Sequence, residues 1–261
     1  MKAEDGRRVY VELSEYAAIR TKVLSTMLEP LTTIIDRYGE LICQVTLILG
    51  KTPPASGRDA AIRDLMADVF DFLMETRPLI SKGKVAIAYP LARRAYESLS
   101  LMIACHLDES LAKRWIAGKQ IGNAEVRRVL GKHPLGEPQE QTQELYNFFS
   151  KTTHPNRDQI TQRFLGDGNE FVLGAIGRPS LAILADYGIK LLNLWLWFVA
   201  FICFIYADVL ERADPDFHKT YHDVSASVNP VTKWLGEQFN RVLAEEQAEM
   251  AGITSRTNCG E

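Results

Sequence analysis

The chain has 261 residues, and its 30 Lys and Arg residues against 33 Asp and Glu residues give a formal charge of −3. This balance excludes a global basic field that would attract nucleic-acid phosphates, and it argues neither for nor against any other partner. With 46% hydrophobic and 24% charged residues, the composition is that of a globular protein and excludes a disordered chain. We therefore expect a sizeable core.

Hydrophobic periodicity predicts helices along most of the chain. The clearest pattern is at 58–77, where apolar residues from Ile62 to Met74 recur at spacings of three and four and charged residues fill the other face. Breaker residues at 51–57 predict a loop before it. Asn123 is a candidate N-cap. The predicted helices are residues 12–29, 30–49, 58–77, 89–106, 109–116, 123–130, 138–154, 181–212 and a last helix from 230.

Residues 164–173 interrupt the helical pattern. Gly166-Asp167-Gly168 lies there between two apolar pairs, which favours a short β-hairpin or an irregular loop. A phosphate-binding loop would need the GxGxxG or GxxxxGK[ST] spacing, and neither is completed. We therefore expect a turn.

The most hydrophobic segment, 191–207, is interrupted only by Asn193. A membrane-spanning helix needs about 20 apolar residues, so we favour a buried core helix and keep a membrane segment as the lesser alternative. With Ser180 as N-cap, the helix is predicted to run over 181–212 as the spine of the bundle. Its aromatic residues cover nearly every face and are expected in the core. They are Trp195, Trp197, Phe198, Phe201, Phe204 and Tyr206.

The four cysteines form no CxxC pair, and three of them, Cys43, Cys105 and Cys203, lie in apolar stretches where a reduced thiol packs as a small hydrophobic group. The charged N-terminus has no apolar segment typical of a secretory signal. A cytoplasmic location is the expectation. No internal repeat or domain boundary is evident, so we predict one all-α bundle domain over 1–250 and a disordered tail over 251–261.

One polar cluster could carry chemistry. Arg94 and Glu97 are neighbours on a predicted helix, and Ser150, His154 and Asn156 surround the end of another. If the helices meet, the Arg, the Glu and the His form an acid/base-capable pocket, with Arg94, Glu97 and His154 as candidate catalytic residues. An equally weighted interpretation is a structural hydrogen-bond network that fixes the helix packing.

At these residues the sequence resembles bacterial all-α proteins related to the HEPN helical domains. The shared pattern is Arg93-Arg94-Ala-Tyr-Glu97, followed about fifty residues later by Tyr146-Asn-Phe-Phe-Ser150-Lys-Thr-Thr-His154-Pro155. The resemblance implies a helical bundle that self-associates, in a class that includes ribonuclease toxins and phage-defence proteins. It adds Arg93 to Ser150 and Asn156 as candidate binding residues.

Active HEPN ribonucleases carry an Arg followed, after four to six residues, by a His on one helix. No Arg stands at that spacing before His154. Arg127 and Arg128 with His133, and Arg212 with His218, fit the spacing, but about one match is expected by chance.

His218 and His222 also have a metal-like spacing, which we interpret as a solvated surface segment because the pattern lacks the metalloprotease Glu. We expect no metal and no cofactor. The leading hypothesis is a self-associating module, a homodimer or a binder of another protein, in a defence or stress system. The alternative is a metal-independent HEPN-type endoribonuclease acting on RNA.

Overall fold

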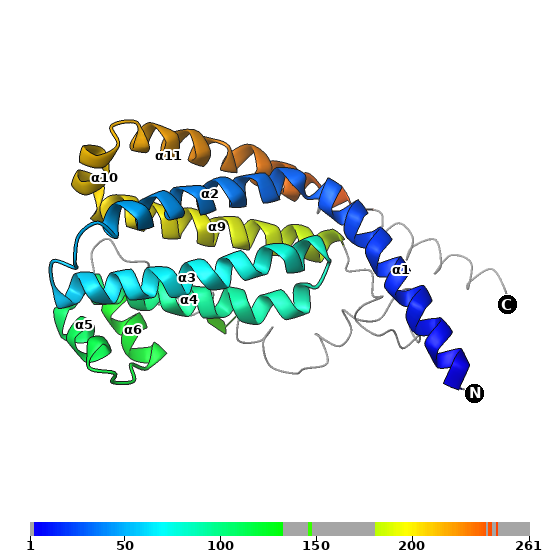
Figure 1. Cartoon of the computed structure of the whole chain (residues 1–261), viewed down its shortest axis with the longest axis horizontal. Coiled ribbons are helices and arrows are strands. Elements are labelled where there is room, and N and C mark those ends of the chain that lie inside the picture. Colours follow the sequence, from blue (N-terminus) through cyan, green and yellow to red (C-terminus); the bar gives the residue numbers. More distant parts are fainter. Residues whose placement is uncertain (1–2, 133–145, 148–180, 239, 242–243, 245–261) are drawn as a thin grey trace.

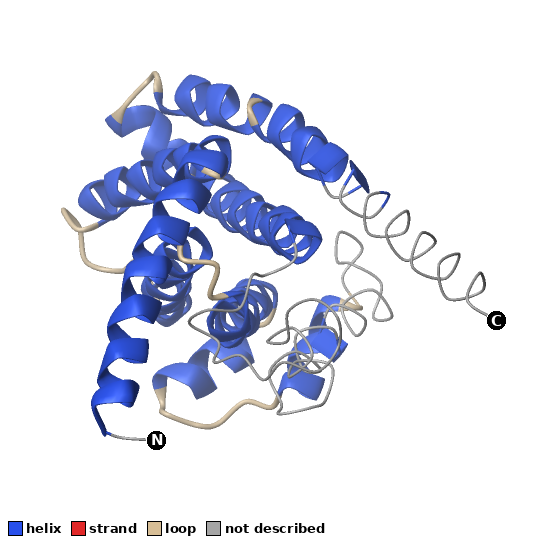
Figure 2. Cartoon of the chain, turned by 90° about the vertical axis from the view of Figure 1, so that its right-hand side faces the viewer, coloured by secondary structure: helices blue, strands red, loops and turns tan. Residues whose placement is uncertain are grey.

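The computed structural model describes residues 3–132, 146–147, 181–238, 240–241 and 244. Every regular element in this part of the chain is a helix, which confirms the predicted all-α bundle (Figure 2). The buried apolar side chains form one continuous cluster. The turn expected at 164–173 and the tail at 251–261 lie outside the described residues, and the single domain over 1–250 stays a prediction.

The long helices lie side by side along the length of the molecule (Figure 1). α2, α4 and α9 run in one direction, and α3 and α11 run back between and beside them. The helices are α1 (Ala3–Met27), α2 (Glu29–Leu49), α3 (Gly57–Ser81), α4 (Val85–Leu107), α5 (Glu109–Ile116), α6 (Asn123–Leu130), α9 (Leu181–Ile205), α10 (Ala207–Ala213), α11 (Phe217–Ala226) and a further helix at 228–238.

The loop between α2 and α3 is held by side chains of α3. Ser56 caps α3, because its Oγ accepts a 3.1 Å hydrogen bond from the N–H of Asp59. Arg63 donates 2.8 Å hydrogen bonds to the carbonyls of Leu49 and Thr52, which satisfies oxygens at the end of α2 and in the loop. The predicted loop is therefore present, and its ends are fixed.

The turn from α3 to α4 is built on Gly83. Its φ of 67° is the left-handed conformation that favours glycine. The N–H of Gly83 donates to the carbonyl of Ile80 at 2.9 Å and the N–H of Lys84 donates to that of Leu79 at 2.8 Å, which is the Schellman pattern. α4 begins two residues after Gly83, four residues earlier than predicted, and Pro90 lies inside it rather than at its start.

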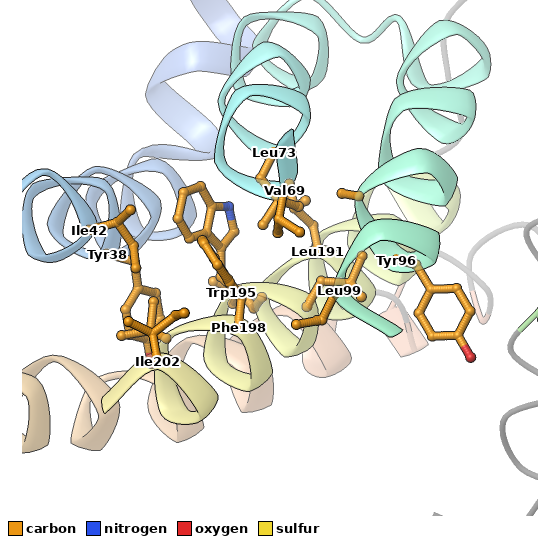
Figure 3. Close-up of a cluster of buried hydrophobic side chains, with 14 of the residues drawn as sticks. Tyr38, Ile42, Val69, Leu73, Tyr96, Leu99, Leu191, Trp195, Phe198 and Ile202 are labelled. Atoms are coloured by element: carbon orange, nitrogen blue, oxygen red, sulfur yellow. The ribbon is translucent and has the colours of Figure 1, made fainter. Parts of the chain in front are cut away.

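α9 supplies the centre of the core. Its Trp195 stacks almost parallel to Tyr38 of α2, with ring centroids 6.4 Å apart, and meets the edge of Phe70 of α3 at 6.2 Å (Figure 3). A Cβ at Gly188 would lie 3.0 Å from Leu31, so this glycine lets α9 approach α2 closely. The predicted spine is confirmed for this part of the helix.

The long helix is shorter than predicted. α9 ends at Ile205 and α10 starts after Tyr206, so the expected helix over 181–212 is broken. At the break, the hydroxyl of Tyr206 donates a hydrogen bond to Asp59 at the start of α3. Not every apolar residue of the region is core. Phe204 is 68% exposed and Cys43 on α2 is exposed, contrary to expectation.

After the break, the chain returns along α2. The segment around 214–223 contains most of α11. Gln44 of α2 donates a 2.6 Å hydrogen bond to Asp214, and Tyr38 donates one of 3.3 Å to Ser225. These contacts explain why α11 lies against α2 (Figure 1).

α5 and α6 close one end of the bundle beside α3 and α4 (Figure 1). Arg114 of α5 makes a two-fold ion pair with Glu125 of α6, with N···O distances of 2.5 and 3.0 Å. The predicted bounds of both helices are confirmed. The N-cap of α6 is Gly122, however, because the side chain of Asn123 is turned to another partner.

One helix in the described part of the chain, Ile183–Ile205 within α9, is long and apolar enough to cross a membrane, with a mean hydropathy of 2.0. Half of its most apolar stretch is buried inside the protein. The core helix of a globular protein has the same length and composition. Burial of Trp195, Phe198 and Ile202 against α2 and α3 gives this helix a core role.

Candidate functional site

The candidate residues Arg93, Arg94 and Glu97 all lie in the middle part of α4. The other three, Ser150, His154 and Asn156, lie outside the described residues. The described side of the site is therefore α4 together with the helices that it contacts.

Arg93 and Glu97 form an ion pair one helical turn apart. Arg93 Nε donates a 2.9 Å hydrogen bond to Glu97 Oε1, and the two side chains are only 17% and 18% exposed. The same oxygen accepts a 3.0 Å hydrogen bond from the amide of Asn123 on α6. The carboxylate thus holds Arg93 in one position and ties α4 to α6.

Arg94 faces a different neighbour. Its Nη2 lies 3.3 Å from a carboxylate oxygen of Asp68 on α3, and its guanidinium lies 5.7 Å from the centre of the Phe72 ring. Ser98 donates a hydrogen bond to the same carboxylate. The expected pairing of Arg94 with Glu97 is replaced, because residues four apart meet more directly on this helix than residues three apart and Arg94 points toward α3.

Tyr146 contacts two arginines, Arg93 of α4 and Arg127 of α6. Its hydroxyl accepts a 3.1 Å hydrogen bond from Arg93 Nη2. The guanidinium carbons of Arg93 and Arg127 lie 5.2 and 4.5 Å from the centre of its ring. We call Arg93, Glu97, Asn123, Arg127 and Tyr146 the Arg93 cluster.

The sequence pattern does not place Arg127 and Asn123 here: it gives Arg127 as a candidate partner of His133 and Asn123 as a candidate helix cap. The sequence does contain a signal that points to these two residues. Both lie on the short helix at 123–130, which covers α4, and Asn123 stands four residues before Arg127, so the two share one face. Tyr146 belonged to the pattern of the HEPN resemblance.

Of the remaining candidate pairs, Arg212 with His218 is the one whose two residues are both described. Arg212 is in α10 and His218 in α11, with the break at Asp214 and Pro215 between them. Arg212 Nε donates to the carbonyl of Asp208 at 2.9 Å. The match of Arg212 with His218 therefore does not have the geometry of a one-helix dyad, and His133 lies outside the described residues.

His218 and His222 do not form a metal site with their neighbours. No group of three or more His, Cys, Asp or Glu side chains among the described residues could hold a metal ion. His218 is partly buried, with its Nε2 at 3.4 Å from the carbonyl of Ala207, and His222 is exposed. The expectation of a wholly solvated segment thus holds for His222 alone.

Comparison with known proteins gives no matching family model, no similar curated protein and no similar solved structure. The relation to HEPN domains therefore rests on the sequence pattern and stays a prediction. The endoribonuclease alternative also stays a prediction, because its His154 is not among the described residues.

Proposed function

We propose that this chain is a self-associating helical module and that two copies join through α1. The observation that supports the proposal is that α1 extends away from the bundle (Figure 1) and exposes large apolar side chains to solvent. Tyr10 and Ile19 are 71% and 65% exposed, whereas Leu24 near the end of the helix is buried. Since most helical stability in proteins comes from packing an apolar face, α1 has a reason to bind a further surface.

Some of the exposed side chains recur on one side of the helix, whereas the exposed Tyr10 lies off that side. Positions 11, 15, 19 and 22 follow one another at spacings of three and four, which places them on one face. We call this the outer face of α1. Its members, all exposed, are Val11, Glu12, Glu15, Ile19, Lys22 and Val23.

The charges of the outer face favour a second copy, arranged antiparallel, as the partner. If the two helices cross at the height of Ala17 along the helix axis, Val11 lies opposite Val23 of the second copy and Glu12 lies opposite Lys22 of the second copy. A parallel pair would instead place Glu12 against Glu12 and Lys22 against Lys22. An antiparallel pair is two-fold symmetric, so each contact occurs twice and the assembly closes as a dimer.

A helix of 25 residues is about 37 Å long, so a single helix pair buries a small interface, below about 1,200 Å² in total. Association in the micromolar range is expected. The resemblance to HEPN-related proteins adds the context of the proposal, a bacterial defence or stress system in the cytoplasm.

The test is the oligomeric state of the purified chain, measured by sedimentation equilibrium from about 1 to 200 µM. We expect a monomer–dimer equilibrium that Ile19→Glu with Val23→Glu abolishes. Leu47→Glu is the matched control, because Leu47 is a 72% exposed apolar residue on α2. A chain that is monomeric throughout, or a dimer that the Leu47 variant disrupts equally, contradicts the proposal.

The antiparallel register has its own test. Lys22→Glu places like charges opposite Glu12 twice in the dimer and should weaken it by about 1–2 kcal/mol, roughly 5- to 30-fold in Kd. The double variant Lys22→Glu with Glu12→Lys restores opposite charges and should recover the affinity. No recovery, together with a normal far-UV spectrum, would reject this register.

A further inference from the structure

The Arg93 cluster has more positive than negative charge. It contains two guanidinium groups and a single carboxylate, Glu97, which already pairs with Arg93. The nearest acid on α6, Glu125, is held by Arg114 in a two-fold ion pair. Arg127 is therefore left with no carboxylate partner among the described residues.

One N–H group of the cluster is buried without an acceptor. Nη1 of Arg127 is inaccessible to solvent and makes no hydrogen bond. Leaving such a donor unpaired is costly, and buried polar groups without a partner call for an explanation. The ring of Tyr146 attracts the charge of this guanidinium, but it offers at most a weak π acceptor to an N–H.

The hydroxyl of Tyr146 provides a second donor at the same place. Because its oxygen accepts from Arg93 Nη2, its own hydrogen points elsewhere, and none of the described residues accepts it. Arg93 itself is held by Glu97, and Glu97 is fixed by Asn123. Among the described residues, donors thus outnumber acceptors in this partly buried cluster.

We propose that the Arg93 cluster binds a phosphate group, with the Arg127 guanidinium and the Tyr146 hydroxyl as the donors and Arg93 as the group that orients Tyr146. A guanidinium matches the oxygens of a phosphate with two parallel N–H bonds. The donors come from residues on separate segments, and the oxygens of a tetrahedral phosphate accept from several directions, whereas those of a carboxylate share one plane. The phosphate is either a free anion or a monoester on a larger ligand.

The test is calorimetric titration of the full chain at constant ionic strength with inorganic phosphate, with O-phosphoserine and with acetate. We expect inorganic phosphate to bind with a Kd of about 1 mM or tighter, and acetate at least about tenfold more weakly. Tighter binding of O-phosphoserine than of phosphate identifies a monoester as the ligand, and the reverse order identifies the free anion. Both orders support the proposal.

The variants separate a built site from general attraction to a cation. Arg127→Gln should weaken phosphate binding about tenfold or more, while Arg128→Gln, the same charge change at the next, exposed position, should leave it within about twofold. Tyr146→Phe keeps the ring and removes the hydroxyl, so it should weaken phosphate binding several-fold. This variant tests the site even if Arg127→Gln fails to fold. Three results overturn the proposal. They are a wild type that does not bind phosphate, a Tyr146→Phe variant and a folded Arg127→Gln variant that both bind it as the wild type does, or an Arg128→Gln variant that loses as much binding as Arg127→Gln.

Discussion

The hydroxyl of Tyr206, at the end of α9, donates a 2.5 Å hydrogen bond to Oδ1 of Asp59, at the start of α3. The two residues are 147 positions apart in the sequence. Asp59 also accepts from Arg63, which holds the loop between α2 and α3. One carboxylate thus connects the end of α9 with the beginning of α3.

Removal of this hydroxyl should destabilise the fold. A hydrogen bond to a charged acceptor contributes about 1.5–3 kcal/mol, so Tyr206→Phe should lower the free energy of unfolding by about that amount in urea titrations. Tyr10→Phe, the same chemical change at an exposed position, should have no effect. Equal midpoints for the two variants would show that the hydrogen bond does not stabilise the protein.

The same carboxyl makes stability depend on pH. Burial alone would raise the pKa of Asp59, but the hydrogen bonds from Tyr206, the Ala55 N–H and Arg63 outweigh it and hold the pKa below its ordinary value. A carboxyl whose pKa is lower in the folded than in the unfolded state stabilises the fold above the unfolded-state pKa, about 3.9. This contribution is lost as the pH falls through the folded-state pKa.

The free energy of unfolding lost in Asp59→Asn should therefore be constant between about pH 6 and 7 and shrink below about pH 4. Urea titrations of the two proteins at matched pH values measure it. A difference that stays the same down to about pH 3 would mean that Asp59 has an ordinary pKa in the folded state.

Two phenylalanines of α9 should respond very differently to truncation. Phe198 is fully buried beside Trp195, with ring centroids 6.1 Å apart, whereas Phe204 is 68% exposed. Phe198→Ala should cost about 3–5 kcal/mol and Phe204→Ala less than about 0.5 kcal/mol. Thermal and urea unfolding of both variants measure the costs. A large cost at Phe204 would indicate that another surface covers it in solution.

Two glycines should respond with opposite signs. Gly83 has a positive φ, so Gly83→Ala should destabilise the turn between α3 and α4 by about 1–2 kcal/mol. Gly236 lies in the helix at 228–238, where a Cβ meets no atom within 4 Å, so Gly236→Ala should stabilise by about 0.5–1 kcal/mol. Urea midpoints give both signs directly, and a stabilising Gly83 variant would contradict the Schellman turn.

The thiols should differ in reactivity. Cys43 is exposed, whereas burial raises the pKa of Cys105 and of Cys203 to about 12. Replacing the fourth cysteine by Cys259→Ser leaves these three thiols. The native variant should react rapidly with one equivalent of a disulfide reagent at pH 8, and the unfolded variant with three. Rapid modification of two or more thiols in the native state would show that the core opens more readily than its packing implies.

Periodicity predicted the helices well and their ends less well. The pattern at 58–77 has one apolar face, so it could be interpreted from local sequence alone. The start of α4 could not, because Pro90 normally marks the first turn of a helix, and only packing of Val85 and Tyr89 in the core outweighs that preference. The break at Tyr206 coincides with a hydrogen bond to Asp59, a residue far away in the sequence, which a local pattern does not contain.

Part of the candidate site could be predicted from helical periodicity. Its α4 residues are adjacent in sequence, and helical geometry brought Arg93, Arg94 and Glu97 to attention. The choice between Arg93 and Arg94 as the partner of Glu97 depends on which neighbouring helix each one faces. Periodicity contains no information on that choice, nor on the approach of Arg127 to Tyr146.

Among the residues whose burial the structure describes, Leu24 is the first deeply buried side chain, and Leu28 follows it just before α2. The described side chains of α1 before Leu24 are exposed or half-buried, and Arg20 donates a 3.0 Å hydrogen bond to the carbonyl of Lys82, so the described part of this segment adds little apolar burial to the bundle that surrounds Trp195. A chain shortened to begin a few residues before Leu24 should keep the melting temperature of the body. If two copies pair through α1 as we propose, exchange of this arm changes the pairing specificity and leaves the core as it is.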